Sequence, residues 1–153
     1  MKTGGTAISR WMKDTMRSDY IYNHLQEIEK FGLIKKHIIS IRDPISRHIS
    51  KMNWGIQVGY ENWTDELANN DQYNFLVRNI PLMNSYEFIR QEFLQEDFNK
   101  AFETDDILSL ANVSKVKEYS WDKMSEEEKD QLRQRYEPEY SMLKSLGIEY
   151  NIP

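Results

Sequence analysis

The chain of 153 residues contains no cysteine, which excludes a disulfide scaffold, a thiolate metal site and a cysteine nucleophile. It has no run of about 18 apolar residues, so a membrane-spanning helix is not expected. No apolar segment follows the first five residues, and a secretory signal is therefore not expected either. Since no repeat or Pro/Gly-rich linker divides the chain, we expect one domain over residues 1–153, in a soluble cytoplasmic protein with a modest core.

Charge is unevenly distributed along the sequence. The net charge is −5, yet residues 1–51 carry ten Lys/Arg against five Asp/Glu, while residues 52–153 carry ten against twenty. Binding to nucleic acid needs a broad positive surface, so a nucleic-acid partner is not expected. A compact basic region suits a small polyanionic ligand better. The alternative is that the charges are scattered without function.

The hydrophobic pattern predicts an α/β fold, in which a short and mostly parallel sheet is flanked by helices. Two short runs resemble strands, over residues 38–41 and 86–89. Residues 54–63 show no period and are expected to form a loop. The Ser125/Glu128 pair is a capping-box signature, and the helix that it opens should break or kink near Pro138. The expected helices are 6–17, 22–31, one starting at Asp43-Pro44, 65–78, 94–102, 125–136, and a last one ending at Gly147.

The segment Lys2-Thr3-Gly4-Gly5-Thr6-Ala7 runs directly into the first expected helix. Glycines allow backbone N–H groups to close around phosphate-like oxygens, and the start of a helix adds positive potential. The lysine precedes the glycines, so this is not the GxxxxGK[ST] nucleotide loop, in which the lysine follows them. Taken alone, the string is interpreted more simply as a flexible chain start.

A second segment, Arg42-Asp43-Pro44-Ile45-Ser46-Arg47-His48-Ile49-Ser50, follows the first expected strand. Open α/β sheets bind ligands at the carboxyl ends of their strands, where Arg42 would lie. Arginine offers a planar fork for a phosphate, and Ser50, two helical turns further on, offers a hydroxyl donor. The alternative reads Arg42 and Asp43 as a surface ion pair.

Together these segments resemble the sulfotransferases that use 3′-phosphoadenosine 5′-phosphosulfate (PAPS). That family has a PKTGGT-like loop followed by an R-D-P-x-x-R-x-x-S stretch, and both occur here in that order. Three further segments match later family patterns and extend the likeness over nearly the whole chain: Glu92-x-Leu94-x-x-Asp97, Ala111-Asn112-Val113-Ser114, and Tyr136 to Tyr150.

The resemblance implies a minimal P-loop-like sulfotransferase fold and the transfer of a sulfuryl group from PAPS to an acceptor hydroxyl, leaving 3′-phosphoadenosine 5′-phosphate (PAP). A carbohydrate acceptor is favoured over a phenol or a steroid. Catalysis would come mainly from positioning and charge stabilisation, without a metal. The implied cofactor-binding residues are Lys2, Thr3, Gly4, Gly5, Thr6 and Ala7 at the 5′ end, Arg42 and Ser50 at the 3′-phosphate, and Asn112 and Ser114 in the closing loop. Lys2 would also stabilise charge on the leaving phosphate oxygen.

A general base is needed for the acceptor hydroxyl, and we expect it to be His24. Several carbohydrate sulfotransferases place a histidine between the two motifs, usually after a glycine, whereas Asn23 stands here. Glu27 and Glu29 are the alternatives, and His24 could also be an ordinary surface residue. His37 and His48 are interpreted more simply as structural or ligand-flanking residues.

Aromatic residues after Ser50 admit two interpretations, an acceptor platform or core packing; they are Trp54, Tyr60 and Trp63. The family normally has a hydrophobic strand directly before the phosphosulfate loop, whereas Met1 stands before Lys2 here. We expect a shortened product or another segment that fills the gap, and an exposed sheet edge would favour a homodimer. The rival functions are an inactive PAP-binding or interaction protein and a small ATP-dependent kinase, which would require Mg²⁺.

Overall fold

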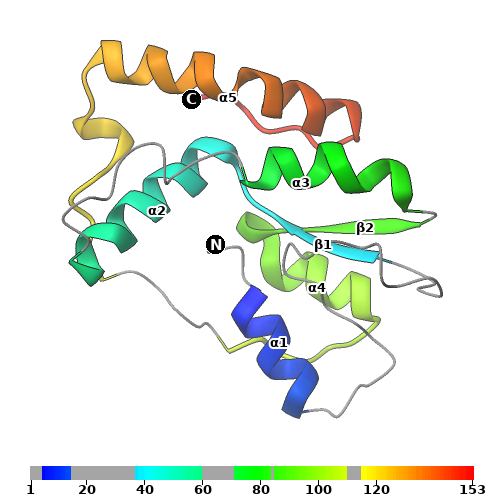
Figure 1. Ribbon diagram of the computed structural model, residues 1–153. Helices are drawn as coiled ribbons and strands as arrows, with labels where there is room; N and C mark the ends of the chain where they lie inside the picture. Colours follow the sequence, from blue (N-terminus) through cyan, green and yellow to red (C-terminus); the bar gives the residue numbers. More distant parts are fainter. Residues whose placement is uncertain (1–4, 15–36, 60–70, 84, 110–114) are drawn as a thin grey trace. The chain divides into compact units, whose positions relative to one another are not determined.

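The computed structural model describes residues 5–14, 37–59, 71–83, 85–109 and 115–153. These residues form an α/β structure that is mostly helical, with one short parallel sheet (Figure 1). The chain gathers into two compact units, each made from two separate stretches of sequence. The sheet unit comprises residues 2–42 and 71–113, and the helix unit comprises residues 43–70 and 114–153. The expectation of a single domain over 1–153 stays a prediction.

The sheet unit is built on two parallel strands, β1 (His37–Ile41) and β2 (Tyr86–Arg90). His37 pairs with Tyr86 and Ile41 with Arg90, so both strands end at the same edge of the sheet. The four residues from Ile38 to Ile41 are all buried, as expected for a strand that is covered on both faces. Both strand predictions from the sequence are confirmed, with each strand one residue longer than expected.

Helices cover both faces of this sheet. In Figure 1, α3 (Asp71–Asn79) lies above the strands, while α1 (Gly5–Asp14) and α4 (Leu94–Phe102) lie below them. Two short 3₁₀ turns, η2 (Ile80–Leu82) and η3 (Gln91–Phe93), precede and follow β2. The bounds of α4 agree with those predicted. The later part of the expected helix 65–78 is α3, and residues 65–70 lie outside the described part of the chain.

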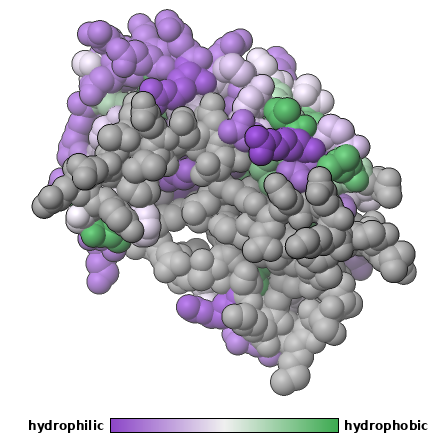
Figure 2. Space-filling view, in the orientation of Figure 1, coloured by the Kyte–Doolittle hydropathy of each residue, from purple (hydrophilic) through white to green (hydrophobic). Residues whose placement is uncertain are grey.

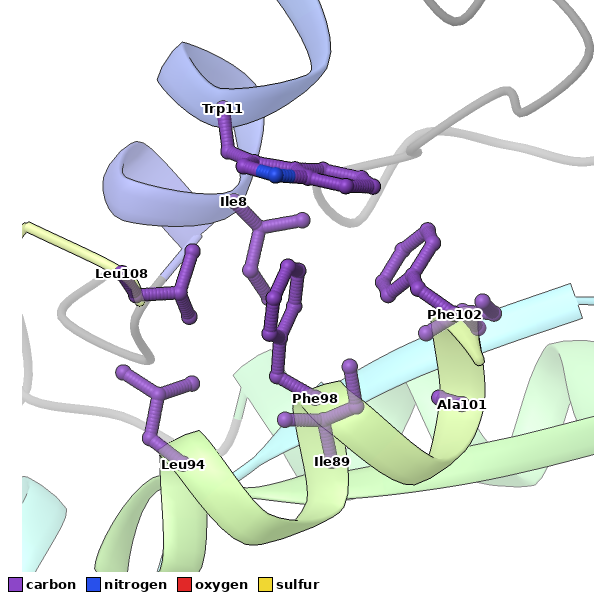
Figure 3. Packing of buried hydrophobic residues seen from close by; sticks show 9 residues of the cluster. Ile8, Trp11, Ile89, Leu94, Phe98, Ala101, Phe102 and Leu108 are labelled. Carbon is purple, nitrogen blue, oxygen red and sulfur yellow. The ribbon is translucent and has the colours of Figure 1, made fainter. Parts of the chain in front are cut away.

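An aromatic cluster joins α1 and α4 below the sheet (Figure 3). The Trp11 ring meets Phe98 edge-on at a centroid distance of 4.8 Å and an interplanar angle of 88°. Its indole Nε1 donates to Asp106 Oδ2 at 2.8 Å, which satisfies the one polar atom of a mostly buried ring. Trp11 is therefore a core residue. The cluster contains Ile8, Trp11, Ile38, Ile89, Leu94, Phe98, Ala101, Phe102 and Leu108.

The helix unit consists of α2 (Pro44–Val58), the 3₁₀ turn η4 (Trp121–Lys123) and α5 (Glu126–Ser145). Ser125 opens α5 with the predicted capping box: its side chain accepts from the Glu128 backbone, and the Glu128 side chain accepts from Ser125 N. Hydrophilic side chains gather over α5 (Figure 2). The apolar side of α5 packs with α2 in a second core made of Ile45, Met124, Leu132, Tyr136 and Tyr140.

Two predictions about helix ends are wrong. The expected loop over 54–63 is helical as far as Val58, and α2 ends only at Gly59, whose φ of 70° provides a left-handed C-cap. The expected break near Pro138 is wrong, because α5 continues through it to Ser145 as one element; a kink at this position stays a prediction. The separate helices expected before and after Pro138 are therefore one helix. The expected helix 22–31 lies outside the described residues.

Within the described ranges, no helix is long and apolar enough to cross a membrane.

Candidate anion site at the carboxyl edge of the sheet

Arg42 directly follows β1 and therefore lies at the carboxyl edge of the parallel sheet, as the sequence predicted. Its side chain is 24% exposed, and the Nε atom of its guanidinium is buried. Its Nε lies 3.9 Å from Glu92 Oε1, which is the long end of the range for an ion pair. An ion pair of this length contributes little to stability. The Arg42 side chain places a positive charge at the edge where open α/β sheets bind ligands.

The backbone of Arg42 is held by the side-chain amide of Gln72. Gln72 Oε1 accepts from Arg42 N at 3.0 Å, and Gln72 Nε2 donates to Arg42 O at 3.0 Å. Gln72 lies in the first turn of α3 and is only 1% exposed. One amide therefore pairs with both backbone groups of Arg42, as a neighbouring strand would, and fixes the residue just beyond the end of β1.

A second arginine ends the neighbouring strand. The guanidinium of Arg90 donates from Nε to Asp97 Oδ2 at 2.8 Å and from Nη2 to Asp97 Oδ1 at 2.7 Å, and Arg90 N donates to Oδ2 at 2.8 Å. The same guanidinium lies over the Phe93 ring, 4.4 Å from its centroid. Desolvation acts to raise the pKa of Asp97, but its hydrogen bonds to Arg90, together with the charges of Arg90 and Lys100, outweigh it and lower the pKa.

We expect Asp97→Asn to lower the free energy of unfolding at pH 7 by about 2 kcal/mol, since it weakens hydrogen bonds to a charged partner. The folded-state pKa of Asp97 lies below 3.8, so its stabilising effect is present above that pH and is lost as the pH falls through the folded-state value. Urea unfolding should therefore show a difference in the free energy of unfolding between wild type and variant at pH 7, and this difference should become smaller below about pH 4. Asp105→Asn, at an exposed position, is the control and should show no gap. A gap that is independent of pH would contradict this role of Asp97.

The helix that carries Ser50 begins in the same motif. Asp43 is the N-cap of α2, and its Oδ1 accepts from Ser46 N at 2.7 Å. Pro44 occupies the first turn, where the missing N–H costs no helical bond. Asp43 is 8% exposed, so its interpretation as half of a surface ion pair is wrong. Ser50 is half-buried on α2. Arg42 belongs to the sheet unit and Ser50 to the helix unit, and each is described within its own unit.

A buried ion pair joins α2 to α5. Arg47 Nη1 donates to Glu139 Oε1 at 2.6 Å, and Nη2 donates to Oε2 at 2.8 Å. Both side chains are 1% exposed, so the two charges have left water together and are matched in a two-pronged contact. Arg47 is the second arginine of the R-D-P-x-x-R-x-x-S stretch, and the structure gives it an architectural role.

Two tyrosines of α5 complete the contact with α2. His48 Nδ1 lies 2.9 Å from the Tyr136 hydroxyl, and the Tyr140 hydroxyl donates to Asp43 Oδ2 at 2.7 Å. Burial, and then the negative charge of Asp43, raise the pKa of the Tyr140 hydroxyl, which therefore stays protonated as a donor. His48 is fully buried, and its structural interpretation is confirmed. We call these six residues the α2–α5 network: Asp43, Arg47, His48, Tyr136, Glu139 and Tyr140.

The remaining predicted site residues are only partly described. The helix α1 begins at Gly5, so Thr6 and Ala7 lie in its first turn, where backbone N–H groups have no partner within the helix. Ala7 is buried. Lys2, Thr3, Gly4, His24, Asn112 and Ser114 lie outside the described residues, as do Glu27, Glu29, Tyr60 and Trp63. Trp54 is half-buried within α2 and not in a loop. His37 is the first residue of β1, and burial lowers its pKa.

Sequence reasoning missed Gln72 and Glu139. A glutamine in a helix carries no local sign of a backbone partner 30 residues away. For Glu139 a signal existed. Tyr136, Glu139 and Tyr140 have the spacing of one helical face, and Asp43 and Arg47 are four residues apart, which is also the spacing of one helical face. The negative charge of Glu139 and the positive charge of Arg47 could therefore have been paired. Among the described residues, no group of three or more His, Asp or Glu side chains is placed to hold a metal ion.

No protein-family model, curated protein or solved structure matches the chain.

Proposed function

We propose that the chain is a PAPS-dependent sulfotransferase that moves a sulfuryl group to an acceptor hydroxyl, with a carbohydrate hydroxyl favoured. In this proposal Arg42 and Ser50 hold the 3′-phosphate, and Lys2 with the backbone from Thr3 to Ala7 holds the 5′-phosphosulfate. Asn112 and Ser114 close on the nucleotide. The proposal includes a P-loop-like sulfotransferase fold, to which the two parallel strands with helices on both faces would belong.

One observation carries the proposal. The R-D-P-x-x-R-x-x-S stretch spans a strand end, a turn and a helix start: Arg42 follows β1, and Asp43 caps the helix α2 that carries Ser50. Ligands of open α/β sheets bind outside the carboxyl ends of the strands, and arginine matches a phosphate with two parallel hydrogen bonds. A surface loop with the same letters would not present the arginine in this way.

Two features of the described residues support a ligand that carries two anionic ends. Arg42 supplies a positively charged side chain, 24% exposed, for one of them. The first turn of α1, entered directly from the Lys2–Gly4 segment, supplies backbone N–H groups and the positive end of a helix dipole for the other. Both features belong to the sheet unit.

The proposed reaction balances without a further reactant. The acceptor oxygen forms a bond to sulfur as the bond between sulfur and the 5′-phosphate oxygen breaks, and PAP leaves with the electron pair of that bond. His24 takes the proton of the acceptor hydroxyl as general base, with Glu27 and Glu29 as alternatives. Lys2 stabilises the charge that develops on the leaving phosphate oxygen.

We expect PAP to raise the melting temperature of the full chain, because a ligand at about a hundred times its Kd adds roughly 2.7 kcal/mol to stability. The measurement is differential scanning fluorimetry with PAP, with ATP, and with ATP plus Mg²⁺. PAP should act without Mg²⁺, and ATP should act weakly or not at all. A hydroxyl-acceptor screen with PAPS then tests transfer directly.

The other outcomes separate the rival functions. Stabilisation by ATP only in the presence of Mg²⁺ would replace the proposal with a kinase. Stabilisation by PAP without transfer to any acceptor in the screen would indicate a nucleotide-binding protein that is not an enzyme. No response to PAP at any concentration up to the millimolar range would overturn the proposal.

A further inference from the structure

We propose that Gln72 is a positioning residue for the 3′-phosphate: it sets the direction of Arg42 by holding that residue's backbone from both sides. This inference rests on the proposed function, since it concerns the same anion site. It adds a residue from α3, which belongs to none of the segments that resemble the sulfotransferase family.

The first argument is the geometry of the contact. Arg42 stands one residue beyond the end of β1, where the ladder to β2 has ended. At that point its N–H and C=O would otherwise have to be satisfied elsewhere. The Gln72 amide satisfies both, with two bonds of 3.0 Å each. The Arg42 backbone is thus fixed as if the sheet continued for one more residue.

The second argument is the burial and origin of the glutamine. Gln72 is 1% exposed, so its amide is shielded from competing water, and its two bonds account for both polar ends of the side chain. It comes from the first turn of α3, the helix that lies above the strands in Figure 1. Groups that bind a ligand need to be held within about 0.5 Å, and a buried amide on a helix provides such a support.

The third argument is the length of the ion pair between Arg42 and Glu92. The contact to Glu92 joins Nε and Oε1 at 3.9 Å, with 24% and 31% of the two side chains exposed. A contact of this kind does not define the direction of a long side chain. A fixed backbone narrows the region that the guanidinium can reach, which favours a planar, two-pronged contact with one phosphate over a diffuse attraction.

The test compares two nucleotides that differ only in the 3′-phosphate. The dissociation constants of PAP and AMP are measured by isothermal titration calorimetry on the full chain, and their ratio gives the selectivity for the 3′-phosphate. Gln72→Met keeps the length of the side chain and removes both hydrogen bonds. We expect it to lower the selectivity about 10-fold, in the range typical of residues that support a ligand-binding group, while AMP binding changes little.

Asn79→Leu is the matched control. Asn79 is a second buried amide on the same helix, 7% exposed, and its Nδ2 donates to Phe75 O at 2.8 Å. This variant also removes a hydrogen bond made by a buried side-chain amide of α3, but the residue that it changes does not contact Arg42. It should lower the melting temperature and leave the selectivity unchanged. A purely structural role of Gln72 would give the same result in both variants.

Gln72→Asn provides a second route if Gln72→Met does not fold. It keeps a neutral amide but shortens the side chain by one methylene, so the amide no longer reaches the Arg42 backbone and the selectivity for the 3′-phosphate should again fall. Unchanged selectivity in a folded Gln72 variant would overturn this inference alone, provided that wild type prefers PAP and Arg42→Ala loses that preference. A failure of both Gln72 variants to fold would also count against it, by making Gln72 a residue of the core. No preference for PAP in wild type would overturn the proposed function and this inference together.

Discussion

Replacement of Glu139 by alanine is expected to lower the free energy of unfolding by about 3–5 kcal/mol. Arg47 is 1% exposed, and both of its terminal nitrogens donate to Glu139. Without the carboxylate, a guanidinium would remain in the protein interior with its charge uncompensated. Urea unfolding at neutral pH, followed by far-UV circular dichroism, measures the loss. A native domain of this size has a stability of about 5–15 kcal/mol, so the variant would be close to unfolding.

Two further variants separate the ion pair from the helix. Glu137→Ala removes a glutamate from an exposed position of the same helix and should change stability by less than about 0.5 kcal/mol. The double variant Arg47→Leu with Glu139→Leu removes both charges and should recover most of the loss, because well-packed apolar side chains can replace a buried ion pair. If Glu139→Ala cost no more than Glu137→Ala, the architectural role assigned to Arg47 would be wrong.

The second large effect concerns ligand affinity. Arg42→Ala should weaken the binding of PAP on the order of 100-fold, since hydrogen bonds to a charged group are worth about 2–3 kcal/mol and each 1.4 kcal/mol is a factor of ten. Binding of AMP should hardly change, because it lacks the 3′-phosphate. Arg42→Lys keeps the charge but not the planar fork, and an intermediate affinity is expected. Calorimetric titration with both nucleotides measures these effects.

Arg78→Ala is the control for the change in charge. Arg78 lies in the last turn of α3 and is exposed, so its removal alters the net charge equally without changing the carboxyl edge of the sheet. This variant should bind PAP as wild type does. If Arg42→Ala also bound PAP with the wild-type affinity, the 3′-phosphate would have to be held elsewhere, and the assignment of the motif would fall.

Much of the sheet unit could be predicted from local sequence. The β-branched run at Ile38, Ile39 and Ile41 forms the expected strand, because a strand buried on both faces needs apolar residues without alternation. In the helix unit, the capping box at Ser125 and Glu128 is also a local signal, and it is confirmed at the predicted position. Signals of this kind involve residues that are close in the chain, so one sequence is enough to recognise them.

The errors arose where contacts distant in sequence decide the outcome. Residues 54–58 have no helical period, but Asn53 pairs with the backbone of Tyr119 through two bonds of 2.7 and 2.8 Å, which supports α2 beyond the point where the pattern fades. Pro138 cannot donate a backbone hydrogen bond within its helix. The buried contacts of Glu139 and Tyr140, which directly follow it, hold α5 together across that gap.

The candidate site divides in the same way. The position of Arg42 followed from a strand signal and a motif, both local. Its partner Gln72 is 30 residues away, and the partners of Asp43 and Arg47 are 97 and 92 residues away. Such pairings depend on the tertiary fold and on the requirement that buried polar groups be satisfied. Sequence spacing alone does not reveal them.

The discontinuity of the two units has a consequence for how the chain folds. The sheet unit needs residues on both sides of the 43–70 stretch, and the helix unit needs residues on both sides of the 71–113 stretch. During synthesis Arg47 emerges 92 residues before Glu139, so its charge must stay hydrated until Glu139 has been made. Closing long loops before any native contact forms slows folding. The sheet unit has all its residues only once residue 113 has been made, and the helix unit still needs α5 after that point.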